Sequence, residues 1–193
     1  MPPEALTLLG QTTIVTSTVF LAGLCLFASA HKFSNLPRFK KVVEDYQILP
    51  QAMIGVVAGG LPLFELFIGV AILVPASSSL AALMISGLFA LYGVAMLSTI
   101  LRGKALQDCG CGGPAHTHGQ AQVLGAWHII RNALLVLMAL GVASNAVVSI
   151  HTIEAQAWLL VVPASAFLAL LYWAADTLIA NHGLMSANKH RLN

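Results

Sequence analysis

The sequence has 193 residues, of which 58% are hydrophobic and 8% are charged, and its formal net charge is +2. Soluble domains carry roughly 25% charged residues, so this composition excludes an ordinary soluble globular domain. The small, scattered net charge gives no reason to expect nucleic acid as a partner. The class that remains is a helical membrane protein whose surroundings are the lipid bilayer.

Five apolar runs approach or reach the roughly 20 residues that cross a bilayer as a helix. They predict spans at about residues 12–30, 52–74, 80–101, 125–148 and 157–180. The first run ends in a sequence that imitates a signal-peptide cleavage site, Ala28-Ser29-Ala30, but no Lys or Arg precedes it, so we expect a retained span. The sequence thus predicts one all-α integral membrane domain over residues 1–193, a bundle of about five transmembrane helices with a four-helix core plus one.

The first connection, residues 31–50, mixes basic and apolar side chains. Its sequence is HKFSNLPRFKKVVEDYQILP, in which Phe39, Val42 and Val43 alternate with Lys and Arg. Such a pattern is typical of a short amphipathic helix that lies in the membrane interface. We therefore expect an interfacial helix between the first two spans.

The third connection, residues 102–124, contains the segment QDCGCGGPAHTHG. A disulfide between Cys109 and Cys111 closes a very small ring, and strained disulfides are readily reduced, so this pair suits thiol exchange. With His116 and His118 the two thiolates also make a sensible ligand set for Zn or Cu, although the spacing departs from that of zinc fingers. Unpaired thiols and solvated histidines in a plain loop are the third interpretation.

The order of the spans relates these connections to each other. The end of the first span, the start of the second, the end of the third and the start of the fourth must all face one side of the membrane. Residues 31–50 and 102–124 therefore share a compartment. Cys25 lies in the first span near that side, either as a small buried apolar group or as a third thiol activated by Lys32 or Arg131.

Ionisable side chains inside the spans are costly and indicate function. Glu65 lies in the middle of the second span, either as a protonated carboxyl bonded to a neighbouring helix or as a group that exchanges protons during thiol or quinone chemistry. Arg131 and Asn132 begin the fourth span, where Arg131 either reaches the interface or stabilises a thiolate or an anionic quinone. Asp176 and Lys189 are expected to be ordinary boundary residues.

Five segments in order, from about residue 20 to residue 137, resemble the methylamine utilisation protein MauE family. They are HKF after the first span, DYQILP at 45–50, LPLFELFIG at 61–69, LRGKALQDCGCGG at 101–113 and RNALL at 131–135. The most specific is the basic, glycine-containing segment that leads into Asp-Cys-Gly-Cys-Gly, followed by Arg-Asn at the start of a helix.

The resemblance implies a membrane accessory protein for maturation of methylamine dehydrogenase, whose periplasmic small subunit is rich in disulfides. It implies MauD, a thioredoxin-like protein, as partner and Cys109 and Cys111 as the exchanging pair. Lys32, Tyr46, Glu65 and Arg131 match the family by position, without an implied role. MauE is also distantly similar to DoxX proteins and to the bundles of vitamin K epoxide reductase and DsbB, which makes quinone a candidate cofactor. Those relatives use Cys-x-x-Cys and a second pair, so a two-pair relay cannot be built within this chain.

The location that follows is the bacterial cytoplasmic membrane. The cysteine loop faces either the cytoplasm or the periplasm. Lys and Arg gather in the first and third connections and the C-terminal tail, which indicates the cytoplasm by the positive-inside rule. The resemblance indicates the periplasm instead. Two other functions stay open, namely a soft-metal carrier that uses Cys109, Cys111, His116 and His118, and a non-catalytic scaffold for MauD.

Overall fold

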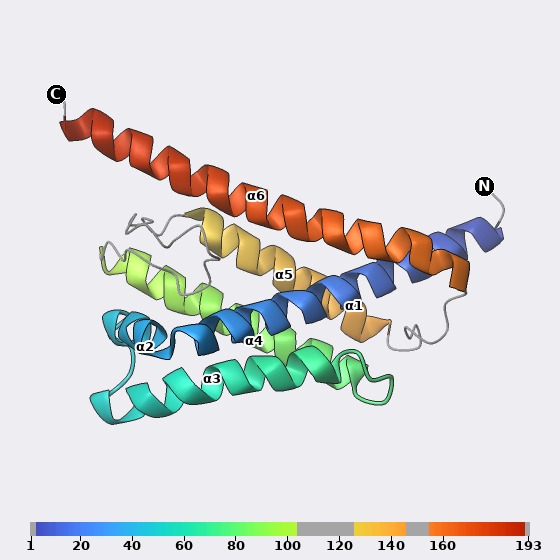
Figure 1. The fold of residues 1–193 in the computed structure, drawn as a ribbon, viewed down its shortest axis with the longest axis horizontal. Helices are drawn as coiled ribbons and strands as arrows, with labels where there is room; N and C mark the ends of the chain where they lie inside the picture. Colours follow the sequence, from blue (N-terminus) through green and yellow to red (C-terminus); the bar gives the residue numbers. More distant parts are fainter. Residues whose placement is uncertain (1–2, 104–125, 146–154, 192–193) are drawn as a thin grey trace.

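The structure, a computed structural model, describes residues 3–103, 126–145 and 155–191, with side chains for 8–103, 127–145 and 155–178. The described residues form six α-helices and one 3-10 turn (Figure 1): α1 (Pro3–Ser34), α2 (Leu36–Asp45), α3 (Gln51–Ala71), α4 (Ser78–Leu101), α5 (Ala126–Ser144), η2 (Ala155–Ala157) and α6 (Trp158–Arg191). Five are long and apolar enough to cross a membrane: Leu8–Ser34, Gln51–Ala71, Ser78–Leu101, Trp127–Ser144 and Ala155–Leu178. The expected all-helical bundle with five spans is confirmed.

The break between α1 and α2 follows from local sequence. Pro37 has no backbone N–H with which to continue the hydrogen bonds of α1, so it is tolerated only in the first turn of a new helix. Asn35 caps that helix, its Oδ1 accepting a hydrogen bond from the Arg38 backbone N–H at 3.3 Å. No such signal lies earlier in α1, so this helix runs further at both ends than the apolar run alone indicates.

The amphipathic connection is confirmed as a helix with two different faces. In α2 the side chains of Phe39 and Val42 are buried, whereas those of Arg38, Lys40 and Lys41 are exposed. The helix lies at one end of the bundle, between the end of α1 and the beginning of α3 (Figure 1). Its buried face therefore closes that end.

Four of the spanning helices build the core and the last one packs outside it. The buried apolar cluster draws on α1, α3, α4 and α5, with Leu21, Ile68, Ile85 and Ala139 fully enclosed. The described part of α6 packs mainly against α1 and leaves most of its large apolar side chains exposed. This arrangement matches the predicted four-helix core plus one.

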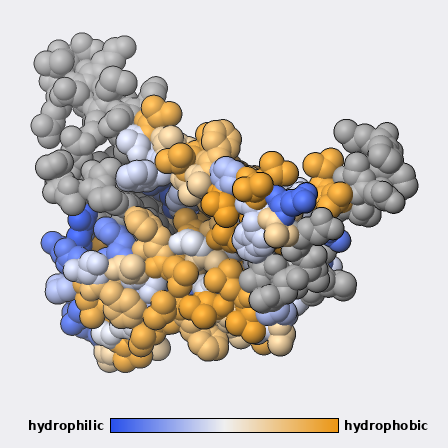
Figure 2. All heavy atoms as spheres, turned by 45° about the vertical axis from the view of Figure 1, so that its right-hand side comes forward, coloured by the Kyte–Doolittle hydropathy of each residue, from blue (hydrophilic) through white to orange (hydrophobic). Residues whose placement is uncertain are grey.

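One end of the bundle collects the polar groups. There α1 and α4 end, while α3 and α5 begin, with α2 beside them (Figure 1). Apolar side chains cover most of the face in Figure 2, and hydrophilic ones gather toward this same end. We call it the polar end. Both helix termini that flank residues 104–125 lie here, so the order of the spans correctly relates the first and third connections.

Candidate functional site

The residues predicted to do thiol or metal chemistry in the third connection lie outside the described residues. They are Cys109, Cys111, His116 and His118. The described helix ends on either side, Arg102 after α4 and the first turns of α5, place the attachment points of this segment at the polar end. In the described part of the chain, no group of three or more His, Cys, Asp or Glu side chains could hold a metal ion.

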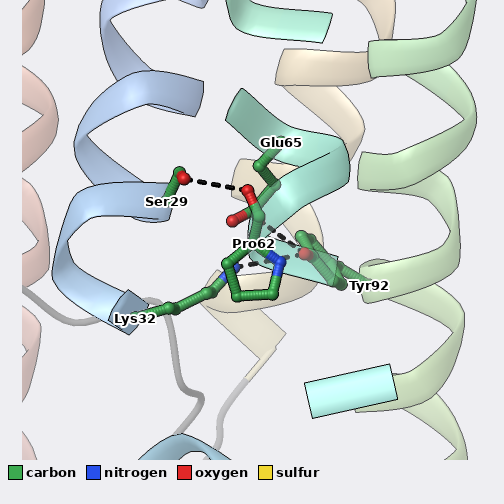
Figure 3. A network of polar contacts seen from close by, with 5 residues as sticks. All are labelled: Ser29, Lys32, Pro62, Glu65 and Tyr92. Atoms are coloured by element: carbon green, nitrogen blue, oxygen red, sulfur yellow. Dashed lines mark hydrogen bonds and ion pairs between the residues drawn. The ribbon is translucent and has the colours of Figure 1, made fainter. Parts of the chain in front are cut away.

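A buried polar cluster joins α1, α3 and α4 (Figure 3). Lys32 Nζ forms an ion pair with Glu65 Oε1 and donates a hydrogen bond to the Tyr92 hydroxyl at 3.2 Å. Tyr92 in turn donates to Glu65 Oε1 at 2.6 Å. The side chains of Lys32 and Glu65 are each 3% exposed. Lys32 and Glu65, which the sequence singles out separately, are thus partners. Tyr92, which the sequence did not indicate, is hydrogen-bonded to both.

The cluster is closed from the polar end by α2. Lys32 Nζ lies 5.1 Å from the centre of the Phe39 ring and 5.0 Å from that of Tyr92, distances at which a cation is attracted to an aromatic face. Glu65 Oε2 is also buried and has no hydrogen-bond partner among the described residues. The charges of Lys32 and Glu65 compensate each other in a site that solvent does not reach.

Cys25 continues the face of α1 that carries this cluster. Cys25, Ser29 and Lys32 follow helical spacing, and Ser29 Oγ donates a hydrogen bond to the Pro62 carbonyl at 2.8 Å (Figure 3). Cys25 is 2% exposed. A Cβ placed on Gly69 would lie 3.1 Å from the Cβ of Cys25, so α1 and α3 approach closely here because Gly69 has no side chain. Whether Cys25 acts as a third thiol stays a prediction.

A second buried ion pair joins α5 to α6. Arg131 Nη1 lies 2.5 Å from Asp176 Oδ1, and each side chain is 5% exposed. The Arg131 guanidinium also lies 5.2 Å from the Tyr172 ring. The expectation that Asp176 is an ordinary boundary residue is therefore wrong. The physical reason is that the buried Arg131 requires a compensating anion, which α6 supplies.

Around Arg131, polar and sulfur-bearing groups connect α5 to α4. The Asn132 amide donates hydrogen bonds to the His128 carbonyl at 2.9 Å and to Met96 Sδ at 3.3 Å. Met96 packs with Tyr46, Ile100 and Ile129. Tyr46, the residue after α2, thereby contacts α4, and Ile129 of α5 contacts the same methionine. His128 itself is 2% exposed.

The two cations proposed to activate Cys25 each have a carboxylate partner. Lys32 pairs with Glu65 and Arg131 pairs with Asp176. Each positive charge is therefore compensated locally. The arrangement fixes helices relative to one another at the polar end. The residues that the sequence singles out outside the third connection take part in it, namely Lys32, Tyr46, Glu65, Arg131 and Asn132.

Sequence reasoning missed Tyr92, Ser29 and the partnership of Asp176. The available signal for Tyr92 was a phenol hydroxyl inside the otherwise apolar third span, since a buried tyrosine hydroxyl needs a hydrogen-bond partner. Asp176 carried a similar signal, a carboxylate before the end of an apolar run. Neither signal identifies the partner.

Comparison with known proteins gives consistent matches. A family model described as methylamine utilisation protein MauE matches residues 10–145. The methylamine utilization protein MauE of Methylophilus methylotrophus is 30% identical over 181 residues, which cover 94% of this chain and 91% of the relative. That of Paracoccus denitrificans is 30% identical over 173 residues, 89% of each chain. No solved structure matches the chain significantly. The family match includes Lys32, Glu65 and the cysteine pair, and it ends before α6.

Proposed function

This chain belongs to the methylamine utilisation protein MauE family, and from that premise we propose that it is a membrane accessory protein in the maturation of a periplasmic methylamine dehydrogenase. It acts by thiol–disulfide exchange at Cys109 and Cys111, with the thioredoxin-like protein MauD as its partner. The observation that carries the proposal is the Cys-Gly-Cys segment, joined at both of its ends to the polar end of the bundle.

The exchange conserves electrons and protons between the two proteins. A thiolate of the partner attacks one sulfur of a Cys109–Cys111 disulfide, and the other cysteine leaves as a thiolate that takes up a proton. The second partner thiol, on losing its proton, attacks the partner's own sulfur in the mixed disulfide, and the cysteine of the chain leaves as a thiolate and takes up a proton. The chain then holds two thiols and the partner holds a disulfide, so two electrons and two protons have passed. The reverse sequence oxidises the chain, and the relative reduction potentials set the direction.

The buried clusters support this activity by holding the helix ends from which the cysteine segment extends. Asn132 and Met96 join the start of α5 to α4, and Arg131 joins α5 to α6. Lys32 and Glu65 hold α1 and α3 beside them. None of these side chains is assigned a part in the covalent step. They are positioning residues, which fix the helix ends that flank the segment.

Dehydrogenase maturation tests the proposal. We expect Cys109→Ser and Cys111→Ser each to abolish the accumulation of small subunit with its full set of disulfides, measured by mass spectrometry of alkylated cell extracts. Cys25→Ser shows whether the buried thiol of α1 takes part, because normal maturation in that variant would restrict the exchange to the segment. Normal maturation in Cys109→Ser would contradict the exchange mechanism and favour a scaffold for MauD.

A second measurement separates exchange from metal carriage and determines the side of the membrane. In intact cells, a membrane-impermeant maleimide should label Cys109 and Cys111 only after reduction, as expected for an exchangeable disulfide on the outside. Labelling that requires permeabilised cells would contradict the periplasmic placement. Copper or zinc that purifies with the protein and is lost in His116→Ala/His118→Ala would favour metal binding over thiol–disulfide exchange as the function of the segment.

A further inference from the structure

The exposed side chains of α2 include three basic residues at the edge of the membrane-spanning bundle, followed by the exposed carboxylates Glu44 and Asp45. Arg38, Lys40 and Lys41 are exposed, whereas Phe39 and Val42 on the other face are buried. The preceding span ends at Ser34 and the following one begins at Gln51. Because both neighbouring spans end beside α2, its charged face lies at the depth where a bilayer changes from hydrocarbon to headgroup.

The orientation of this face is fixed by three contacts, one of α2 and two of the residues that follow it. Phe39 packs on the Lys32 ammonium, and Tyr46 packs with Met96 at the end of α2. Beyond it, Arg102 Nη1 donates a hydrogen bond to the Gln47 carbonyl at 3.3 Å. Rotation of α2 about its axis would break these contacts. Arg38, Lys40 and Lys41 are thus held outward, and the exposed Arg102 lies nearby at the same end.

The order of charges along α2 is the opposite of the order that the helix dipole favours. The basic side chains lie at positions 38, 40 and 41, ahead of Glu44 and Asp45 at the C-terminal end. A helix dipole favours the opposite order. No ion pair to Lys40 or Lys41 is formed within the described residues, although Glu44 and Asp45 follow them at a spacing of four. Neither helix stability nor ion pairing within α2 therefore explains Lys40 and Lys41.

We propose that Arg38, Lys40 and Lys41 form a binding surface for the headgroup of an anionic phospholipid, such as phosphatidylglycerol. The lipid phosphate accepts charge-assisted hydrogen bonds from the ammonium and guanidinium groups. The acyl chains lie against the exposed apolar side chains at the start of α3, which include Met53 and Val56. A lipid is the occupant because the surface lies at headgroup depth and because α3, which carries this apolar face, packs against α2.

This binding surface changes what the basic residues of the first connection indicate about the orientation of the protein in the membrane. Lys32 is neutralised by Glu65 inside the bundle, and the charges on α2 are matched by lipid phosphate. The basic residues of the first connection thus have local roles on either side of the membrane. These basic residues are therefore weaker evidence for a cytoplasmic location than their number suggests. The positive-inside rule then conflicts less with a periplasmic cysteine segment.

Lipid retention by the whole purified chain tests the binding surface. The protein is reconstituted in phosphatidylcholine nanodiscs with or without a minor fraction of phosphatidylglycerol, transferred to detergent, and analysed for bound lipid by native mass spectrometry. We expect phosphatidylglycerol to be retained over phosphatidylcholine, and Lys40→Gln/Lys41→Gln to weaken its retention by about fivefold for each charge removed. Lys40→Arg/Lys41→Arg keeps the charge and should retain the lipid as the unaltered chain does.

Three outcomes would overturn the proposal. The first is equal phosphatidylglycerol retention by Lys40→Gln/Lys41→Gln and the unaltered chain, which would leave these residues for an acidic protein partner. The second is equal retention of both lipids by the unaltered chain. The third is loss of retention in Lys40→Arg/Lys41→Arg with normal gel-filtration behaviour, since charge would then not be the cause. The cysteines take no part in this measurement, so it is independent of the exchange function.

Discussion

Lys32 of α1 and Glu65 of α3 are 33 residues apart in the sequence and form an ion pair enclosed within the spanning helices. Tyr92 of α4 donates a hydrogen bond to the same carboxylate oxygen. Three helices thereby meet at one atom, Glu65 Oε1. This convergence is the reason that substitutions here should affect the packing of the whole polar end.

Removing one partner of this pair should cost more than removing both. Lys32→Met leaves a buried carboxylate and Glu65→Gln leaves a buried ammonium, and each change should lower the free energy of unfolding by about 3–5 kcal/mol. The double variant contains neither charge and should lose much less than the sum. Unfolding by SDS in mixed micelles, followed by tryptophan fluorescence, measures this. Additive losses would show that the two residues are not coupled.

The Tyr92 hydroxyl should stabilise the pair through its short hydrogen bond. Tyr92→Phe keeps the ring beside Lys32 but removes the donor to Glu65, which should cost about 2 kcal/mol. In a Glu65→Gln background the same substitution should cost clearly less, because the charged acceptor is absent. The same unfolding titration compares the two backgrounds. An equal cost in both would mean that Tyr92 stabilises through its ring alone.

Gly69 should tolerate no side chain, unlike other glycines of α3. A Cβ at Gly69 meets the Cβ of Cys25 at 3.1 Å and side-chain atoms of Leu26 at 3.3 Å, whereas a Cβ at Gly59 has nothing within 4 Å. Gly69→Ala should therefore destabilise the protein by about 1 kcal/mol or more. Gly59→Ala is the matched control and should stabilise α3 slightly. A Gly69→Ala variant as stable as Gly59→Ala would contradict the close approach of α1 and α3.

Asp176 should hold α6 against the rest of the bundle. Asp176→Asn removes the charge that compensates Arg131, so hydrogen exchange should increase in residues 158–178 while α3 stays protected. Thr177→Ala is the control, because the Thr177 hydroxyl bonds only within α6, to the Trp173 carbonyl. Unchanged protection of α6 in Asp176→Asn would mean that its packing on α1 suffices.

The sequence predicts the elements of this fold well and their partners poorly. The apolar runs indicate all five spans because bilayer thickness dictates helix length. The alternation around Phe39 and Val42 likewise predicts the buried face of α2. Both signals are local, and each is contained within one helix.

The pairing of buried charges depends on contacts between distant helices. Arg131 and Asp176 are 45 residues apart, and their meeting requires a particular rotation of α6, which packing determines. The sequence places Lys32 in the interfacial connection, because the first apolar run ends at about residue 30. In the structure α2 covers it, so that it reaches a carboxylate within the second span.

The order of these charges along the chain has a consequence for biosynthesis. In both pairs the cation is translated first: Lys32 precedes Glu65, and Arg131 precedes Asp176 by 45 residues. A helix that enters the membrane with an uncompensated charge is disfavoured, so each cation is costly until its later helix arrives. We therefore expect α1 and α5 to remain at the insertion machinery until α3 and α6, respectively, are complete, and ribosome-bound chains truncated before residue 65 to integrate poorly.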